Sequence, residues 1–221
     1  MSRDITRAAH YYKPAADRGH PPSCAALGDL YRFGGGATFP CDKSSAFTYY
    51  KMAADAGDVG GCCGLGEMWE QGDGVVLVSM TTGVLQQDFA EAVRLYRAAA
   101  DQGHAVGQGN LGRMYEHGAG VQQDFERAAD CYRRAALQGV PAAFVALGGM
   151  YERGQGLEVD AAMAASLYQA AADAGFVQAQ KCLARMYAHA PLASLLLLCI
   201  NGDDAAGTST AQASSRTSGR R

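Results

Sequence analysis

Glycine clusters are the residues of this sequence that come closest to a chemical motif, because glycine-rich loops bind phosphates through backbone N–H groups. Lys43-Ser44 also has the residue types that end a phosphate-binding loop, but Asp42 precedes the pair and no strand is predicted before it. The clusters recur along the chain, as structural turns would: Gly34-Gly35-Gly36, Gly72-x-Gly74, Gly118-x-Gly120 and Gly154-x-Gly156. We therefore expect turns here, and no nucleotide or other cofactor.

Histidine and cysteine are common metal ligands, but their spacing in this sequence does not suggest a site. The five histidines form no His-Glu-x-x-His motif, and the seven cysteines form no Cys-x-x-Cys pair or zinc-like cluster with histidine. No metal site is predicted. The odd number of cysteines favours free thiols in a reducing compartment. His117 and His189 follow a recurring leucine by six residues, where we expect solvated side chains, with contact to a ligand as the alternative.

Nothing in the sequence indicates catalysis. No Ser/His/Asp set and no carboxylate pair recurs at the spacing of an active site, so no catalytic residues are expected and the protein is predicted not to be an enzyme. Over 221 residues, 48% are apolar, 19% are charged and the formal charge is −3. This composition lacks the basic excess of a nucleic-acid-binding protein and the charge density of a disordered chain.

The chain shows no membrane or secretion signal that we recognise. Its first residues, MSRDITRAAHYYKP, lack the apolar stretch of a secretory signal, and their Ala and Tyr residues have helical spacing. The apolar run from Leu192 to Ile200 is much shorter than the roughly 20 residues that span a bilayer. We expect a cytoplasmic protein without direct membrane insertion.

Two strings of residues repeat along the chain, which predicts two helices in each repeat. The string Tyr-x-x-Ala-Ala-x-x-Gly begins at Tyr12, Tyr50, Tyr96, Tyr132 and Tyr168, and its last two steps are each 36 residues. In the second string, a leucine is followed after three residues by Leu or Met and then by an aromatic residue. The leucines are Leu27, Leu65, Leu111, Leu147 and Leu183.

The string with leucine predicts an amphipathic helix, here called helix A, because its apolar residues share one face. Glycine follows the first four leucines directly, at 28, 66, 112 and 148, and Ala184 follows the last. Glycine inside a helix costs up to ~1 kcal/mol relative to alanine, so we expect close approach of a neighbouring helix to compensate. Another glycine, seven residues after the leucine, is expected to end helix A.

The string with tyrosine predicts the second helix, helix B. Eight residues before each tyrosine is an aspartate suited to cap the helix N-terminus: Asp4, Asp42, Asp88, Asp124 and Asp160. The alanines allow tight helix packing, the tyrosine is expected to fill the remaining gap, and the closing glycine is expected to end the helix.

These residues resemble the Sel-1-like repeat family, a relative of the tetratricopeptide repeat, with the pattern Ala-x-x-Leu-Gly-x-x-Tyr, Gly-x-Gly-Val, then Asp, Ala, Tyr and Ala-Ala. The resemblance implies an all-α fold, a right-handed α-solenoid of helix-turn-helix repeats with a period of about 36 residues. One solenoid is expected over 1–190. It would contain a half repeat at 4–19, repeats at 20–57, 58–103, 104–139 and 140–175, and a half repeat at 176–190.

The pattern is interrupted twice. Residues 76–85 are extra, and we interpret them as an insertion in the loop between helices A and B, either an apolar flap, a partner-binding loop or an artefact of gene prediction. After Tyr187 the register is lost, so 191–200 are expected to form an apolar cap segment and 201–221 a disordered tail.

In helix-pair solenoids the A helices line the concave groove, so candidate binding residues lie on helix A outside its apolar stripe. These are the positions two, five and six residues after the repeat leucine. We expect them to be solvated side chains or, alternatively, a groove with an acidic ladder and neighbouring basic residues. The candidates are Glu67, Glu70, Arg113, Glu116, His117, Glu152, Arg153 and Arg185.

The leading functional hypothesis is a non-catalytic scaffold or adaptor that binds other proteins or peptide segments in this groove. For such proteins the resemblance implies ubiquitin-ligase, membrane-protein quality-control or signalling complexes. The alternative is a β-lactamase-like hydrolase of the bacterial cysteine-rich type, whose repeats carry a disulfide. Cys24 and Cys62 match one half of that bridge, but the partner positions are Ala16 and Ala54, so we do not expect it to form.

Overall fold

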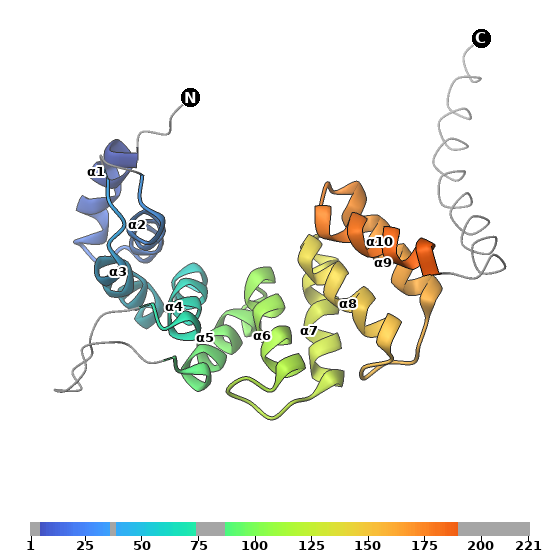
Figure 1. Ribbon diagram of the computed structural model, residues 1–221. Helices are drawn as coiled ribbons and strands as arrows, with labels where there is room; N and C mark the ends of the chain where they lie inside the picture. The colour runs from blue at the N-terminus through green and yellow to red at the C-terminus, as the bar shows by residue number, and fades with distance from the viewer. Residues whose placement is uncertain (1–4, 36–38, 74–86, 190–221) are drawn as a thin grey trace, which may run out of the picture. The chain divides into compact units, whose positions relative to one another are not determined.

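The structure is a computed structural model that describes residues 5–35, 39–73 and 87–189 (Figure 1). These residues form ten α-helices and confirm the predicted all-α repeat fold. The A-type helices are α2 (Pro21–Phe33), α4 (Val59–Gln71), α6 (Ala105–His117), α8 (Pro141–Arg153) and α10 (Val177–His189). The B-type helices are α1 (Ile5–Ala16), α3 (Lys43–Asp55), α5 (Phe89–Asp101), α7 (Phe125–Leu137) and α9 (Ala161–Asp173).

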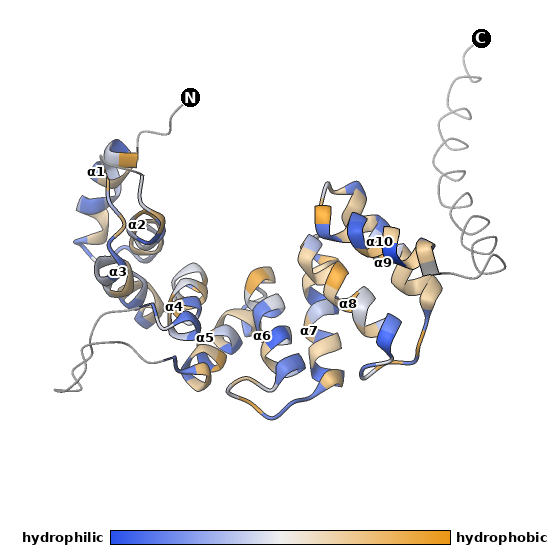
Figure 2. Ribbon diagram, in the orientation of Figure 1, coloured by the Kyte–Doolittle hydropathy of each residue, from blue (hydrophilic) through white to orange (hydrophobic). Residues whose placement is uncertain are grey.

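The chain divides into two compact units, Met1–Val140 with α1 to α7 and Pro141–Arg221 with α8 to α10. Four A helices, α2, α4, α6 and α8, each pack against the B helix that follows, and α10 packs against α9. Figure 2 shows polar and apolar residues mixed along the helices of both units, as expected for helices that bury only one side. A single solenoid over 1–190 stays a prediction.

The predicted aspartate caps are confirmed at the four helices where the cap is described. Asp88, Asp124 and Asp160 each accept a hydrogen bond from the backbone N–H three residues later, at 2.9–3.0 Å. Asp42 accepts from the N–H groups of both Ser44 and Ser45. Each carboxylate thereby satisfies first-turn donors that have no partner inside the helix.

Glycine ends the A helices as predicted, whereas the B helices end earlier than predicted. Gly72 and Gly118 are the left-handed caps of α4 and α6. In contrast, α3 ends at Asp55, Ala56 is its cap, and Gly57 follows with a φ of 81°. The glycine of a B helix therefore lies one residue beyond the cap. The chain reverses its direction there, and this reversal requires a positive φ, which glycine adopts readily.

The core of each repeat is a tyrosine ring packed against a glycine. Tyr50, Tyr96 and Tyr168 are at most 1% exposed. A Cβ added to Gly28 would lie 2.5 Å from the ring of Tyr50, and a Cβ on Gly66 would lie 2.7 Å from that of Tyr96. The expected close approach is therefore confirmed, and the group that approaches is the helix B tyrosine of the same repeat.

Consecutive A helices lie side by side. In the first unit α2 contacts α4 and α4 contacts α6, while no comparable contact between described residues joins α3 to α5 or α5 to α7. The A helices of this unit therefore make closer contacts with one another than its B helices do. In the second unit α8 and α10 are also in contact.

Several predictions fall outside the described residues: the cap at Asp4, the insertion at 76–85, the apolar segment at 191–200 and the tail at 201–221. Within the described part of the chain, no helix is both long enough and apolar enough to cross a membrane.

Candidate partner-binding face

The candidate residues lie on the A helices, and ion pairs join many of them from one A helix to the next. Arg32 of α2 pairs with Glu67 of α4 at 2.5 Å. Glu70 of α4 pairs with Arg113 of α6, both of whose Nη atoms donate to the carboxylate. In the second unit, Glu152 of α8 pairs with Arg185 of α10 at 2.8 Å. We call the A-helix side that carries these residues the A face.

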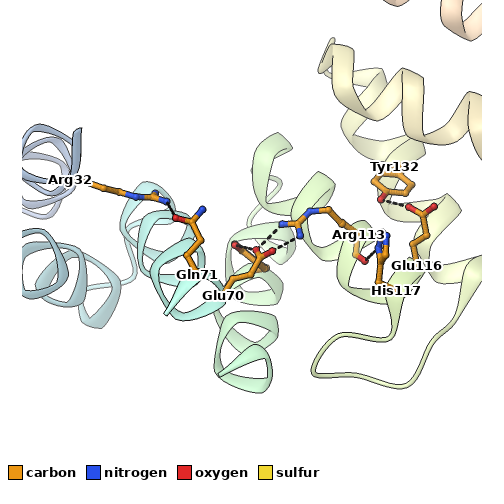
Figure 3. Close-up of polar contacts among 8 residues, drawn as sticks. Arg32, Glu70, Gln71, Arg113, Glu116, His117 and Tyr132 are labelled. Atoms are coloured by element: carbon orange, nitrogen blue, oxygen red, sulfur yellow. Dashed lines mark hydrogen bonds and ion pairs between the residues drawn. The ribbon is translucent and has the colours of Figure 1, made fainter. Parts of the chain in front are cut away.

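The pairs follow one register. In each pair, the residue five positions after the leucine of one repeat contacts the residue two positions after the leucine of the next repeat. Figure 3 shows this contact for Glu70 and Arg113. The sign of the charges is reversed at the first of these junctions, where Arg32 occupies the position that holds glutamate in the following repeats. The arrangement therefore requires opposite charges but does not fix which helix carries which charge.

Glutamates five residues after the repeat leucine also bind the core tyrosines. The hydroxyl of Tyr96 donates to Glu70 at 2.9 Å, that of Tyr132 to Glu116 at 2.7 Å, and that of Tyr168 to Glu152 at 2.9 Å. In the first repeat, the residue five after the leucine is Arg32, and the Tyr50 hydroxyl donates instead to Asp29, at 2.6 Å. Burial raises the pKa of all four tyrosines, and their acidic partners raise it further.

Glu70, Glu116 and Glu152 are therefore not merely solvated side chains, because each carboxylate accepts a hydrogen bond from a buried tyrosine. An acidic and basic groove stays a prediction. The side chain of Glu70 is only 17% exposed. Burial by itself would raise its pKa, but the hydrogen bonds and charge of Arg113 outweigh burial and hold the pKa below its ordinary value. Arg113 and Arg185 largely neutralise the acidic charge of their junctions.

Side chains six residues after the leucine remain open to solvent on the A face. Gln71, His117 and Arg153 are all exposed. Gln71 accepts a hydrogen bond from Arg32 at 3.1 Å, and the Nδ1 of His117 lies 2.9 Å from the carbonyl oxygen of Arg113 (Figure 3). On α4, α6 and α8 the open part of the A face is thus polar, whereas the same position on α2 holds Phe33, which is 72% exposed.

The cysteines of the described residues are free. Burial raises the pKa of four of these thiols, at Cys24, Cys62, Cys63 and Cys131. Cys24 Sγ lies 3.6 Å from the carbonyl oxygen of Ala16, so the position opposite Cys24 is indeed the alanine expected from the sequence. Cys63 Sγ lies 3.1 Å from Nδ1 of His104, a pair that resembles a nucleophile and its base. Burial nevertheless raises the pKa of Cys63 to about 12, helped by Glu67, so this thiol is not activated.

A cavity of about 460 Å³ lies between α5, α6 and α7 and was not predicted from the sequence. Arg97 donates to the Tyr115 hydroxyl at 3.1 Å, the Arg127 guanidinium lies 5.7 Å from the same ring, and Arg134 donates to the Ala100 carbonyl at 3.2 Å. Three acidic side chains also line the cavity: Asp101, Glu126 and Asp130. The arginines thus already have partners, and the cavity has no excess of either charge.

Among the described residues, no three His, Cys, Asp or Glu side chains lie close enough together to bind a metal ion.

Two A helices have N-terminal caps that were not predicted from the sequence. Asp58 caps α4 by accepting a hydrogen bond from the Gly61 N–H, and His104 caps α6 by accepting one from the Gly107 N–H. Their equal offset before the repeat leucine was the sequence signal that would have identified these caps.

Solved structures of repeat proteins are similar to this chain, whereas no curated protein matches it. The c5321 protective antigen of uropathogenic Escherichia coli, which displays an SLR fold, is 34% identical with a TM-score of 0.69, over 84% of this chain and 37% of that one. A Sel1 repeat protein from Oxalobacter formigenes is 30% identical with a TM-score of 0.65, over 77% of this chain and 63% of that one. Immunity protein Pa5087 from Pseudomonas aeruginosa is 25% identical with a TM-score of 0.56, over 81% and 62%.

The chain thus spans about a third of the first of these proteins and under two thirds of the second. The family model for the Sel1 repeat matches five segments, at residues 1–20, 21–58, 60–104, 105–140 and 142–176. Proteins built from this repeat generally act as scaffolds for protein interaction. Because the five matches cover most of the sequence and follow its helix pairs, the chain belongs to the Sel1 repeat family.

Proposed function

We propose that this protein is a non-catalytic scaffold or adaptor that holds a segment of a partner protein on the A face. The observation that carries the proposal is the placement of the polar candidate residues on consecutive, mutually contacting A helices. A partner segment crossing α2, α4 and α6 would meet Gln71 and His117 as open side chains and the ion pairs as a rigid polar floor. The candidates in the second unit, Glu152, Arg153 and Arg185, would serve a partner in the same way.

The ion pairs change the kind of partner that we propose. A ladder of free glutamates would favour a basic segment, but Glu70 and Arg113 neutralise each other, which leaves a surface of alternating charge. Such a surface suits a polar segment of mixed charge, and its affinity would depend weakly on salt because little net charge is screened. The buried, protonated thiols suit a reducing compartment, so we propose that this binding takes place in the cytoplasm.

We propose that the protein is an adaptor in a ubiquitin-ligase, membrane-protein quality-control or signalling complex, because its repeats resemble those of Sel1 repeat proteins. The fold supports an adaptor because rigid stacked helix pairs present an extended surface without requiring a deep pocket.

Steric blocking of the A face tests the proposal. The double variant Gln71→Trp/His117→Trp enlarges two exposed A-face side chains and leaves every ion pair of that face in place. It should lower capture of partner proteins from a cell lysate at least about tenfold, as expected for obstruction near the centre of an interface. The matched variant Lys51→Trp/Arg94→Trp enlarges two exposed side chains of the B helices α3 and α5. Loss of capture by the B-helix variant alone would contradict the proposal.

A further inference from the structure

The two A-face ion pairs of the first unit expose opposite charges to solvent. At the junction of α2 and α4, the Arg32 side chain is only 8% exposed, whereas its partner Glu67 is 32% exposed. At the junction of α4 and α6 the order is reversed, because Arg113 is 40% exposed and Glu70 is 17% exposed. A molecule that approaches the A face therefore meets a carboxylate at the first junction and a guanidinium at the second.

Both exposed groups can form further hydrogen bonds without losing their ion pairs. Arg32 donates to Oε2 of Glu67, and no residue in the described part of the chain donates to Oε1 of that carboxylate. Arg113 uses one N–H of each Nη atom for Glu70, out of the five N–H donors of a guanidinium. Each junction is thus able to bind a second group of the sign opposite to its exposed charge.

The spacing of the two exposed groups follows from the repeat. Glu67 and Arg113 both lie two residues after the repeat leucine, on neighbouring A helices. Each side chain extends toward the preceding A helix, as Figure 3 shows for Arg113. The two charges are consequently about one helix spacing apart, roughly 8–10 Å for packed helices.

A polyproline II segment matches this spacing. It rises about 3.1 Å per residue and completes one turn in three residues, so side chains three positions apart share one side at a separation of about 9.3 Å. A β-strand places the nearest side chains of one face about 6.6 Å apart and the next about 13 Å apart, and it fits less well. An α-helix reaches about 10.5 Å only with side chains seven positions apart.

We propose that the A face binds a partner segment in polyproline II conformation with a basic and an acidic residue three positions apart. The basic residue lies over Glu67 and the acidic residue over Arg113. The inference rests on the function proposed above and adds the order and spacing of the charges that the partner carries. Charge complementarity supports it, because a segment with two like charges would meet a charge of its own sign at one of the junctions.

A displayed peptide library tests the order and spacing of the charges. Its peptides would carry Lys/Glu, Glu/Lys, Lys/Lys or Glu/Glu pairs, two, three or seven positions apart, with uncharged residues elsewhere. After selection on the immobilised full chain, mixed pairs three positions apart should be enriched at least about fivefold over like-charged pairs. Exposed ion pairs are individually weak, but a change of sign replaces attraction by repulsion. Either mixed order supports the proposal, since a segment can cross the helices in both directions.

An exchange of charges within the first junction provides the matched control. Arg32→Glu/Glu67→Arg should keep an ion pair there, because it copies the arrangement of Glu70 and Arg113. The exposed charge of this junction then becomes positive, so the library preference should shift to Glu/Glu pairs. Glu91→Arg/Arg94→Glu exchanges an exposed ion pair of α5 and should leave the original preference unchanged. Circular dichroism checks that both variants fold.

Several results would overturn the inference: equal enrichment of all charge classes, a preference for like charges or for another spacing, or a mixed-pair preference that Arg32→Glu/Glu67→Arg retains. The proposed function has a separate test in the variant Gln71→Trp/His117→Trp. If this variant loses partner capture while the library shows no mixed-pair preference, the A face binds a partner of other chemistry, and only the present inference fails. If capture is unchanged in that variant, the proposed function fails as well.

Discussion

Glu70 and Arg113 lie on consecutive A helices and form a two-pronged ion pair, the longer contact of which is 2.7 Å. The same Glu70 carboxylate accepts a hydrogen bond from the Tyr96 hydroxyl at 2.9 Å. One side chain thus joins the two helices of its own repeat and also joins that repeat to the next. The charged residues of the A face consequently link the helices, and we expect their replacement to lower stability as well as any binding.

A double-mutant cycle on this pair should reveal the coupling between repeats. Glu70→Gln and Arg113→Met should each destabilise the protein, and the double variant should lose less than the sum. We expect a coupling energy of about 1 kcal/mol in urea unfolding, a value reduced by solvent because the Arg113 side chain is 40% exposed. Full additivity would indicate that the ion pair contributes nothing to stacking.

Two glycine substitutions should have opposite effects on stability. Gly28→Ala should destabilise by about 1–3 kcal/mol, because the new Cβ would meet the Tyr50 ring at 2.5 Å. Gly109 lies inside α6, and a Cβ added to it would have no neighbouring atom within 4 Å. Gly109→Ala should therefore stabilise the protein by up to about 1 kcal/mol, because alanine has the higher helix propensity. Thermal unfolding measures both, and stabilisation by Gly28→Ala would show that the tyrosine does not pack as described.

Tyr132 should contribute to stability through both its ring and its hydroxyl. The side chain is 4% exposed and donates to Glu116, so Tyr132→Ala should cost ~3–5 kcal/mol and broaden the unfolding transition by uncoupling neighbouring repeats. Tyr132→Phe removes only the hydrogen bond and should cost about 1.5 kcal/mol. Equal losses for the two variants would assign the whole effect to the hydroxyl.

The cap of α3 predicts a pH dependence of stability. Hydrogen bonds from Ser44 and Ser45 lower the pKa of Asp42 to about 2. Because the folded pKa is below the unfolded value of about 3.9, the stabilisation is fully present above that value and is lost as the pH falls through about 2. Carboxyl-carbon NMR should give this titration midpoint, and Ser44→Ala with Ser45→Ala should raise it. A midpoint near 3.9 in the unsubstituted protein would contradict the cap.

Much of this fold was predictable because its determinants lie close together in the sequence. The aspartate of each B helix caps its own first turn, and the glycine and tyrosine of each core belong to the same repeat. The A-face ion pairs were not predictable in this way, because Arg32 and Glu67 are 35 residues apart and Glu70 and Arg113 are 43 apart. Their pairing depends on how one repeat stacks on the next. Tyr12 is 42% exposed although its sequence string is the same as that of the buried tyrosines, because no A helix of the described residues packs against its ring.

Site-specific photo-crosslinking tests the central claim, binding on the A face, most directly. A photoreactive benzoyl-phenylalanine would replace Gln71 or His117 on the A helices and, in parallel, Lys51 or Arg94 on the B helices, all four of which are exposed. After irradiation in cell lysate, the account predicts the same crosslinked partner from both A-helix positions and none from the B-helix positions. Crosslinking of that partner from the B-helix positions alone would contradict binding on the A face.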